Sequence, residues 1–275
     1  QIVPMLDLNS LNAMAKEIFK QKDNVVIVTA PEKADAPVPT NEQMLAIMNK
    51  VRGAELKPYE DNVVKEPLIA DESKLKGSKV VKTQKNESLG FTEWTLANGI
   101  KVVIKQTPYQ ADNIGVEAIS EGGAAVFSDA EYYSAQMLGG VMSMSGISKF
   151  SASDLRKQLS GKTASASLGV STYEHMVTAS AALKDVETMF QLLYLQFTAP
   201  RFSEDDFTTL MNRYNSMLAN QTSNPDFIFS ENVQKSLYNN NYRRQQLTPE
   251  LLQTIKLEQM PAIHKRLYSN AADFR

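Results

Sequence analysis

Apolar positions near the N-terminus recur at intervals of three and four residues, at Leu11, Met14, Ala15, Ile18 and Phe19. Asp7 and Ser10 lie just before or at the start of this stretch and can cap it, so the spacing predicts an amphipathic helix. Residues 25–29 form a continuous β-branched run, which is typical of a strand covered on both faces. One helix and one strand cannot enclose a core, so we expect residues 1–30 to be the C-terminal tail of a preceding structural unit.

Residues 31–88 differ in character, because prolines interrupt a polar and charged stretch. Helical spacing appears only in residues 40–51, where the apolar positions are Met44, Ile47, Met48 and Val51. We expect residues 31–88 to form a linker that runs partly extended along a surface. Residues 71–87 are rich in lysine and poor in large apolar groups, which leaves disorder open as the alternative.

Alternation of apolar and polar positions returns at Phe91 and predicts a strand over residues 91–96. Asn98-Gly99 follows, which favours a tight turn into a return strand over residues 100–106. Two further stretches alternate in the same way: residues 113–120, which end before Gly122-Gly123, and residues 163–183, which form a second hairpin turning at residues 171–174.

Helical spacing dominates the rest of the chain. The predicted helices cover residues 130–144 after Ser128-Asp129, a short segment from Ser153, residues 185–197 before Pro200, a long segment after Ser203, residues 225–238 after Asn224, and a last helix from Thr248-Pro249 to beyond Ile263. Gly139-Gly140 interrupts the first of them. Hairpins followed by runs of helices predict an α+β fold in which an antiparallel sheet is covered by helices.

Composition narrows the classes of function. The 275 residues are 43% apolar and 22% charged, which is the profile of a globular protein, and one or two domains are expected. The formal net charge of -2 and the lack of a basic stripe exclude a nucleic-acid partner. No apolar run approaches the roughly 20 residues that a membrane-spanning helix needs. The absence of cysteine excludes disulfides, thiolate nucleophiles and cysteine-ligated metal.

His175 and His264 are the only histidines and are therefore the first candidates for metal ligands. Catalytic zinc usually takes three protein ligands and keeps a fourth position open. His175 falls in the second predicted hairpin and His264 in the last predicted helix, so neither has a partner ligand at helical spacing. We expect His175 to be a polar hairpin residue, His264 to lie on one face of an amphipathic helix, and neither to bind zinc.

Other motifs also have simpler structural explanations. Ser143 to Gly146 lack the G-x-S-x-G pattern of a serine hydrolase, and Gly139-Gly140 lack the spacing of a phosphate-binding loop. Acidic residues gather where two helices are predicted to begin, at Asp129 and Glu131 and at Glu204-Asp205-Asp206, where the helix dipole favours them. Met137, Met142 and Met144 are expected to fill the core, and peptide contact is the alternative.

Several segments, taken in order, resemble one known family. Residues 95–104 contain a Leu-x-Asn-Gly hairpin and a Val-rich return, and they are followed by Gly122-Gly123, Ser145-Gly146, residues 193–201 with their Phe-Thr-x-Pro-Arg ending, and Tyr242-Arg243-Arg244-Gln245. This order is similar to a repeat of the pitrilysin/insulinase zinc metallopeptidases and covers residues 89–275. Residues 12–32 likewise resemble the close of the second repeat of such proteins.

The resemblance implies a chain organised as part of a larger enzyme. Family members pair four α/β repeats, each a two-layer sandwich, into two linked halves around a peptide chamber. Residues 1–30 would then end the second repeat, residues 31–88 would link the halves, and residues 89–275 would form most of a truncated third repeat. Both ends of the chain are expected to be internal to a longer parent protein.

The resemblance also says where the zinc should be. Active members carry H-x-x-E-H on the first helix of the first repeat, where two histidines bind zinc and glutamate activates water. The equivalent helix here, over residues 134–142, has neither His nor Glu. We therefore expect no catalytic, cofactor-binding or metal residue in this chain, and zinc only in an N-terminal repeat of the parent protein.

Three functions remain at this stage. The favoured one is the non-catalytic portion of a zinc metallopeptidase, which contributes chamber wall and substrate contacts. Its expected partners are a peptide or unfolded polypeptide and the N-terminal catalytic half, and the resemblance suggests export to a periplasm. The alternatives are a structural or binding paralogue without peptidase activity and an unrelated α+β binding domain.

Overall fold

The computed structural model of the chain divides into two compact units, residues 1–61 and residues 62–275. It describes residues 6–20, 25–30, 37–55, 57, 64, 66–221 and 223–275.

The described residues of the first unit include two helices, both of which the sequence predicts. Helix α1 covers Leu8–Lys20, and α2 covers Asn41–Arg52. Thr40 caps α2 through a reciprocal pair of hydrogen bonds with Gln43, in which each backbone N–H donates to the other residue's side chain, at 2.9 and 3.3 Å. The apolar residues of α1 up to Ile18 are exposed, including Leu8 at 73%.

The strand predicted for residues 25–29 is wrong. Residues 25–30 have no regular secondary structure, and the side chain of Val25 is 86% exposed. A strand requires a neighbour that completes its backbone hydrogen bonds, and none pairs with this segment among the described residues. The β-branched composition is therefore insufficient without a partner strand.

The stretch expected to be a linker up to residue 88 contains elements of the second unit. Leu68 is buried against Ile147 and Phe150, and the carboxylate of Glu66 forms an ion pair with Lys149. A short 3-10 helix covers Glu72–Lys74, and strand β1 covers Val80–Asn86. Sequence analysis missed β1 because its Lys-rich, exposed residues lack apolar alternation.

Strand β1 belongs to a small antiparallel sheet with the order β1-β2-β3. The predicted first hairpin supplies β2 over Phe91–Leu96 and β3 over Lys101–Ile104. Gly99 in the turn between them has a φ of +89°, a backbone conformation that glycine adopts without the steric cost of a Cβ. All residues of this sheet are exposed or half-buried.

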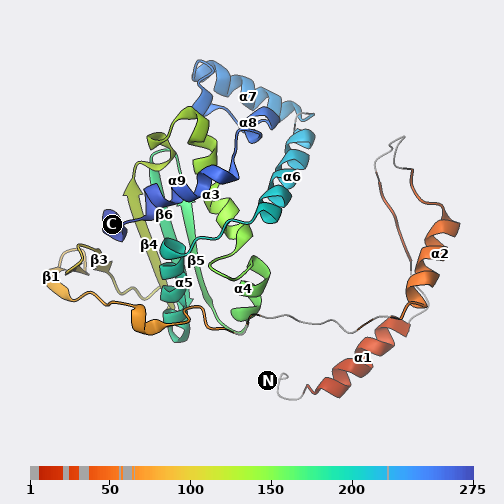
Figure 1. Cartoon of the computed structure of the whole chain (residues 1–275), viewed down its shortest axis with the longest axis horizontal. Helices are drawn as coiled ribbons and strands as arrows, with labels where there is room; N and C mark the ends of the chain where they lie inside the picture. Colours follow the sequence, from red (N-terminus) through yellow and green to blue (C-terminus); the bar gives the residue numbers. More distant parts are fainter. Residues whose placement is uncertain are drawn as a thin grey trace. The chain divides into compact units, whose positions relative to one another are not determined.

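The main sheet is also antiparallel and three-stranded, with the order β4-β6-β5 (Figure 1). Its strands cover Asn113–Glu121 (β4), Ala164–Val170 (β5) and Glu174–Ala182 (β6). Along β6 the residues at odd positions, His175, Val177, Ala179 and Ala181, are buried, while Thr178 and Ser180 between them are exposed. One face of the sheet therefore carries the core and the other faces outward.

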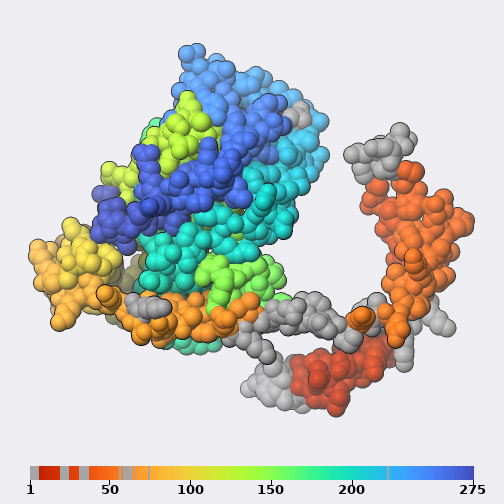
Figure 2. All heavy atoms as spheres, in the orientation of Figure 1, coloured from red at the N-terminus to blue at the C-terminus, as the bar shows by residue number. Residues whose placement is uncertain are grey.

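Two helices cover the buried face. Helix α3 spans Asp129–Ser145, α5 spans Val186–Thr198, and both lie against β5. In Figure 1 the helix α5 lies in front of the main sheet, and in the same orientation Figure 2 shows the teal atoms of this segment in front of that region. Gly139 permits this approach: a Cβ on it would lie 2.4 Å from the backbone oxygen of Leu168 in β5. The two glycines that were expected to interrupt α3 leave it continuous.

The remaining helices are α4 over Ala152–Gln158, α6 over Glu204–Gln221, α7 over Pro225–Leu237, α8 over Pro249–Leu252 and α9 over Met260–Tyr268. Of these helices, α4, α6 and α9 contact α3, and α8 contacts α6. The single last helix predicted from Thr248 is wrong, because the chain leaves the α-helical conformation after Leu252 and a second helix begins at Met260. The predicted α+β fold, a sheet covered by helices, is confirmed.

Candidate functional site

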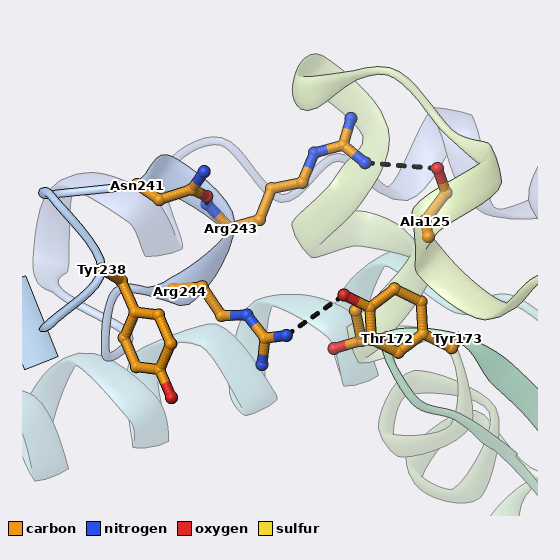
Figure 3. A pocket seen from close by; sticks show the side chains of 7 residues that line it. All are labelled: Ala125, Thr172, Tyr173, Tyr238, Asn241, Arg243 and Arg244. Atoms are coloured by element: carbon orange, nitrogen blue, oxygen red, sulfur yellow. Dashed lines mark hydrogen bonds between the residues drawn. The ribbon is translucent and has the colours of Figure 1, made fainter.

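A pocket of about 320 Å³ opens where three segments of the second unit meet (Figure 3). The segment before α3, the β5–β6 turn and the loop after α7 supply its lining: Ala125, Thr172, Tyr173, Tyr238, Asn241, Arg243 and Arg244. The lining combines two guanidinium groups with two phenol rings. Such a surface can bind an anion or an aromatic group.

The loop after α7 is shaped by asparagines. Asn239 and Asn240 have positive φ values of 49° and 52°, a conformation that asparagine tolerates better than most residues. The side chain of Asn241 then accepts a hydrogen bond from the backbone N–H of Arg243 at 3.0 Å. These features reverse the chain after α7, so that Arg243 points to the segment before α3 and Arg244 points to the β5–β6 turn (Figure 3).

Gly123 allows the opposite wall to form. The residue has a φ of +53°, and a Cβ on it would lie 2.5 Å from both the backbone nitrogen of Glu174 and the backbone oxygen of Ser171. Any larger residue would push the segment before α3 away from the β5–β6 turn. The Gly122-Gly123 pair that marks the family resemblance thus has a local packing role.

The side chain of Arg243 bonds to other residues of the protein and stabilises the wall of the pocket. Its guanidinium donates to the Asp129 carboxylate at 2.6 Å and to the backbone oxygens of Phe127 and Ala125 at 2.8 and 3.2 Å. It also lies 5.0 Å from the centre of the Tyr132 ring. These contacts fasten the loop to the N-terminal end of α3.

Arg244 has a different set of neighbours. It donates to the hydroxyl of Tyr173 at 3.1 Å, and its guanidinium lies 5.8 Å from the centre of the Tyr173 ring and 5.4 Å from that of Tyr238. Figure 3 shows the guanidinium between these two rings. Each such cation–π contact is worth about 0.5–1 kcal/mol at an exposed site. In the described part of the chain, Arg244 has no carboxylate partner.

Two tyrosines of α3 form hydrogen bonds with the backbone of the loop after α7. The hydroxyl of Tyr133 donates to the backbone oxygen of Tyr242 at 2.5 Å, and that of Tyr132 donates to the backbone oxygen of Arg243 at 3.2 Å. Burial, together with the nearby Tyr242, Tyr132 and Asp129, raises the pKa of Tyr133 to about 12. The Tyr133 hydroxyl therefore remains a neutral donor at physiological pH.

The structure brings both histidines to one aromatic cluster, although they lie on separate elements. The rings of His175 and His264 lie 5.3 and 5.4 Å from the ring of Tyr268, and Phe274 contacts His175 at 5.1 Å. Neither the proximity of the two histidines nor the burial of His175 was predicted from the sequence. Each histidine is only 4% exposed. Burial lowers the pKa of both, so the cluster is uncharged near neutral pH.

The histidines have structural partners. The Nε2 atom of His264 hydrogen-bonds with the backbone oxygen of Gln196 at 2.8 Å. Within the described ranges, no three His, Cys, Asp or Glu side chains are grouped as a metal ion requires. Together with their aromatic neighbours, the two histidines link β6, α5 and α9.

The remaining motifs have structural positions. Ser145 ends α3, and its hydroxyl accepts a hydrogen bond from the backbone N–H of Ser203 at 3.2 Å. The acidic clusters lie in the first turns of α3 and α6. Met142 is buried, and Met137 and Met144 pack against the same core, as expected. Helix α3 over residues 134–142 contains no His or Glu.

No family model matches the chain. A relative from Arabidopsis thaliana described as "Zinc protease PQQL-like" is 21% identical over 246 residues, which cover 88% of this chain and 23% of the relative. The crystal structure of the periplasmic protease PqqL from Escherichia coli is 19% identical with a TM-score of 0.65, over 86% of this chain and 26% of that chain.

Two further structures agree with this result. A peptidase M16 inactive domain from Pseudomonas fluorescens matches with 17% identity and a TM-score of 0.53, over 63% of this chain and 42% of its own. Pitrilysin matches with 15% identity and a TM-score of 0.52, over 72% of this chain and 22% of its own. The chain has the pitrilysin fold. The predicted resemblance to the pitrilysin/insulinase family is thereby confirmed.

The pitrilysin-like chain is short beside the proteins it matches. It spans about a quarter of the length of the Arabidopsis relative and of PqqL. No helix in the described residues is long and apolar enough to cross a membrane. The zinc chemistry in the relative's description therefore belongs to a protein about four times as long as the part that aligns with this chain.

Proposed function

We propose that this chain is the non-catalytic portion of a pitrilysin-type zinc metallopeptidase and forms chamber wall and substrate contacts. The observation that carries the proposal is the pairing of a zinc-protease match over 88% of the chain with a helix α3 that has no His or Glu over residues 134–142. The likeness to a peptidase M16 inactive domain adds support. The zinc site would lie in a separate N-terminal repeat.

The proposal assigns a role to each part of the chain. Residues 1–30 end a preceding repeat, residues 31–88 connect two halves, and residues 89–275 form a third repeat without catalytic residues. The partners are a peptide or unfolded polypeptide and the N-terminal catalytic half. A periplasmic or otherwise exported location is proposed because the matched PqqL is described as periplasmic.

Three measurements test this function: the zinc content of the chain, its own peptidase activity, and its effect on a separate N-terminal half. Metal analysis after chelation and zinc reloading should find no stoichiometric zinc on the chain alone, and a fluorogenic peptide should not be hydrolysed. Addition of the chain to a separately produced N-terminal half that carries H-x-x-E-H should raise peptide hydrolysis. One tightly held zinc per chain would contradict the proposal.

Adding the chain to the N-terminal half also distinguishes the peptidase portion from a structural paralogue. A chain that associates with the N-terminal half and leaves hydrolysis unchanged would belong to an assembly without a role in peptide cleavage. The control for contaminating peptidases is an N-terminal half in which the glutamate of H-x-x-E-H is substituted. This variant should not hydrolyse the peptide.

A further inference from the structure

Two adjacent arginines in the pocket loop differ in how their hydrogen-bond donors are used. Arg243 donates to one carboxylate and two backbone oxygens, all within the protein. Arg244 donates to the Tyr173 hydroxyl alone among the described residues, and its side chain is exposed. A guanidinium has five N–H donors, so Arg244 retains donors that can meet a ligand.

We propose that Arg244, held between Tyr173 and Tyr238, binds a carboxylate of a peptide. The guanidinium donates to the Tyr173 hydroxyl at 3.1 Å and lies 5.8 and 5.4 Å from the centres of the two rings, and these contacts restrict its position before a ligand arrives. A side chain ordered in advance loses less entropy on binding. Because the Tyr173 hydroxyl accepts its bond from Arg244, its own proton is left to donate to the same ligand.

The chemistry of the pocket favours a carboxylate. The planar fork of arginine matches the two oxygens of a carboxylate, and the paired bonds add orientation to charge. Arg243 compensates Asp129, the carboxylate on that side of the pocket, so this acid does not compete for Arg244. That the carboxylate belongs to a peptide rests on the proposed function. It can come from an acidic side chain or from the peptide's C-terminus.

Three synthetic peptides of one sequence distinguish these sources. The first has a central Glu and blocked termini, the second has Gln in its place, and the third has Gln and a free C-terminal carboxylate. Titration calorimetry with the 275-residue chain should show one of the carboxylate peptides binding about tenfold more tightly than the blocked Gln peptide. The tighter of the two identifies the source.

Single substitutions test which side chains cause the preference for a carboxylate peptide. Arg244→Gln should remove the difference between the peptides, and Arg244→Lys should retain part of it, since lysine keeps the charge without the fork. Arg213→Gln is the matched control, because Arg213 is exposed on α6, away from the pocket lining, and its loss changes the net charge equally. Tyr173→Phe, which keeps the ring, should weaken carboxylate binding by about threefold. Circular dichroism melting verifies that each variant is folded.

Several results would overturn the assignment. These are equal binding of all three peptides, no detectable binding, an unchanged preference in Arg244→Gln, or an equal loss in Arg213→Gln. If Arg244→Gln does not fold, Arg244→Lys and Tyr173→Phe decide the question. If the carboxylate preference is absent while the chain still raises hydrolysis by the N-terminal half, the carboxylate site alone is rejected. A carboxylate preference without that rise would reject the proposed function alone.

Discussion

The two sheets of the second unit have the same number of strands and the same antiparallel pairing, yet their surroundings differ. The β4-β6-β5 sheet places Val177 and Ala181 at 0% and 1% exposure beneath α3 and α5. The β1-β2-β3 sheet leaves Val103 at 60% and Trp94 at 37% exposure. Strand pairing alone therefore does not create a core in this protein, and the helical cover does.

The covering of the main sheet depends on close contact at particular positions. The helix α3 approaches β5 through Gly139, and α9 places Tyr268 against the same strand, where its hydroxyl donates to the backbone oxygen of Gly169 at 2.8 Å. Among the residues that the structure describes, no helix packs on the small sheet as α3 and α5 pack on the main one, although a Cβ on Gly99 would lie 3.6 Å from that of Ala272. Substitutions should therefore affect the two sheets very unequally.

The largest expected effect comes from the contact between α3 and the main sheet. Gly139→Ala should lower the free energy of unfolding by about 3 kcal/mol, because the new Cβ would lie 2.4 Å from the backbone oxygen of Leu168. Gly140→Ala, one residue on, meets only the Met137 sulfur at 3.6 Å and should raise stability by up to about 1 kcal/mol. Urea unfolding measures both, and equal effects would contradict the close-contact explanation.

A matched pair of valines compares the sheets directly. Val177→Ala in β6 should cost about 2 kcal/mol of unfolding free energy, because the side chain is fully buried. Val103→Ala in β3 should cost less than about 0.5 kcal/mol, since that side chain is mostly exposed. Thermal denaturation followed by circular dichroism gives both values. A similar cost at the two positions would mean that the small sheet is covered in solution.

Acid should destabilise the covered sheet through its histidines. Burial holds the pKa of His175 and His264 below the usual value of 6.5, so below pH 6.5 the unfolded chain binds more protons than the folded one. Stability is therefore present above this pH and is lost as pH falls through it, by up to about 1.4 kcal/mol per pH unit for each histidine. His264→Gln should flatten the profile measured by urea unfolding between pH 7 and 5.

The smallest effect is expected from removing residues 1–30. The described apolar residues of α1 are exposed, so their deletion should change the unfolding free energy of the second unit by less than about 0.5 kcal/mol. Self-association, measured by sedimentation, should become weaker if these residues pair with a second copy. Cooperative loss of structure on deletion would instead show that the tail belongs to the same core.

Sequence reasoning succeeded where a signal is local. The turn at Asn98-Gly99, the start of α3 after Ser128 and the alternation of β6 each depend on a few neighbouring residues, and each appears in the structure. It failed where structure depends on distant partners. Residues 25–29 have strand composition without a neighbouring strand, and β1 has a neighbour that its polar composition did not reveal.

The candidate site was hidden for the same reason. Tyr242-Arg243-Arg244-Gln245 was noticed as a family-like loop, but the pocket also needs Tyr173 and the segment before α3, which are distant in sequence. Nothing in the dipeptide Arg243-Arg244 shows that one guanidinium is bonded within the fold and the other faces a pocket. The burial of His175 was missed because its neighbours Glu174 and Tyr173 are polar and exposed.

The exposed small sheet also bears on aggregation. Its outer strands, β1 and β3, present backbone groups that could pair with another molecule, and such edges are common starting points for intermolecular sheets. Both strands carry lysines, at positions 82, 85 and 101. Two like-charged edges repel each other when they approach, and salt screens this repulsion within about 10 Å at 0.1 M. The tendency of this protein to assemble through its small sheet should therefore be set by ionic strength.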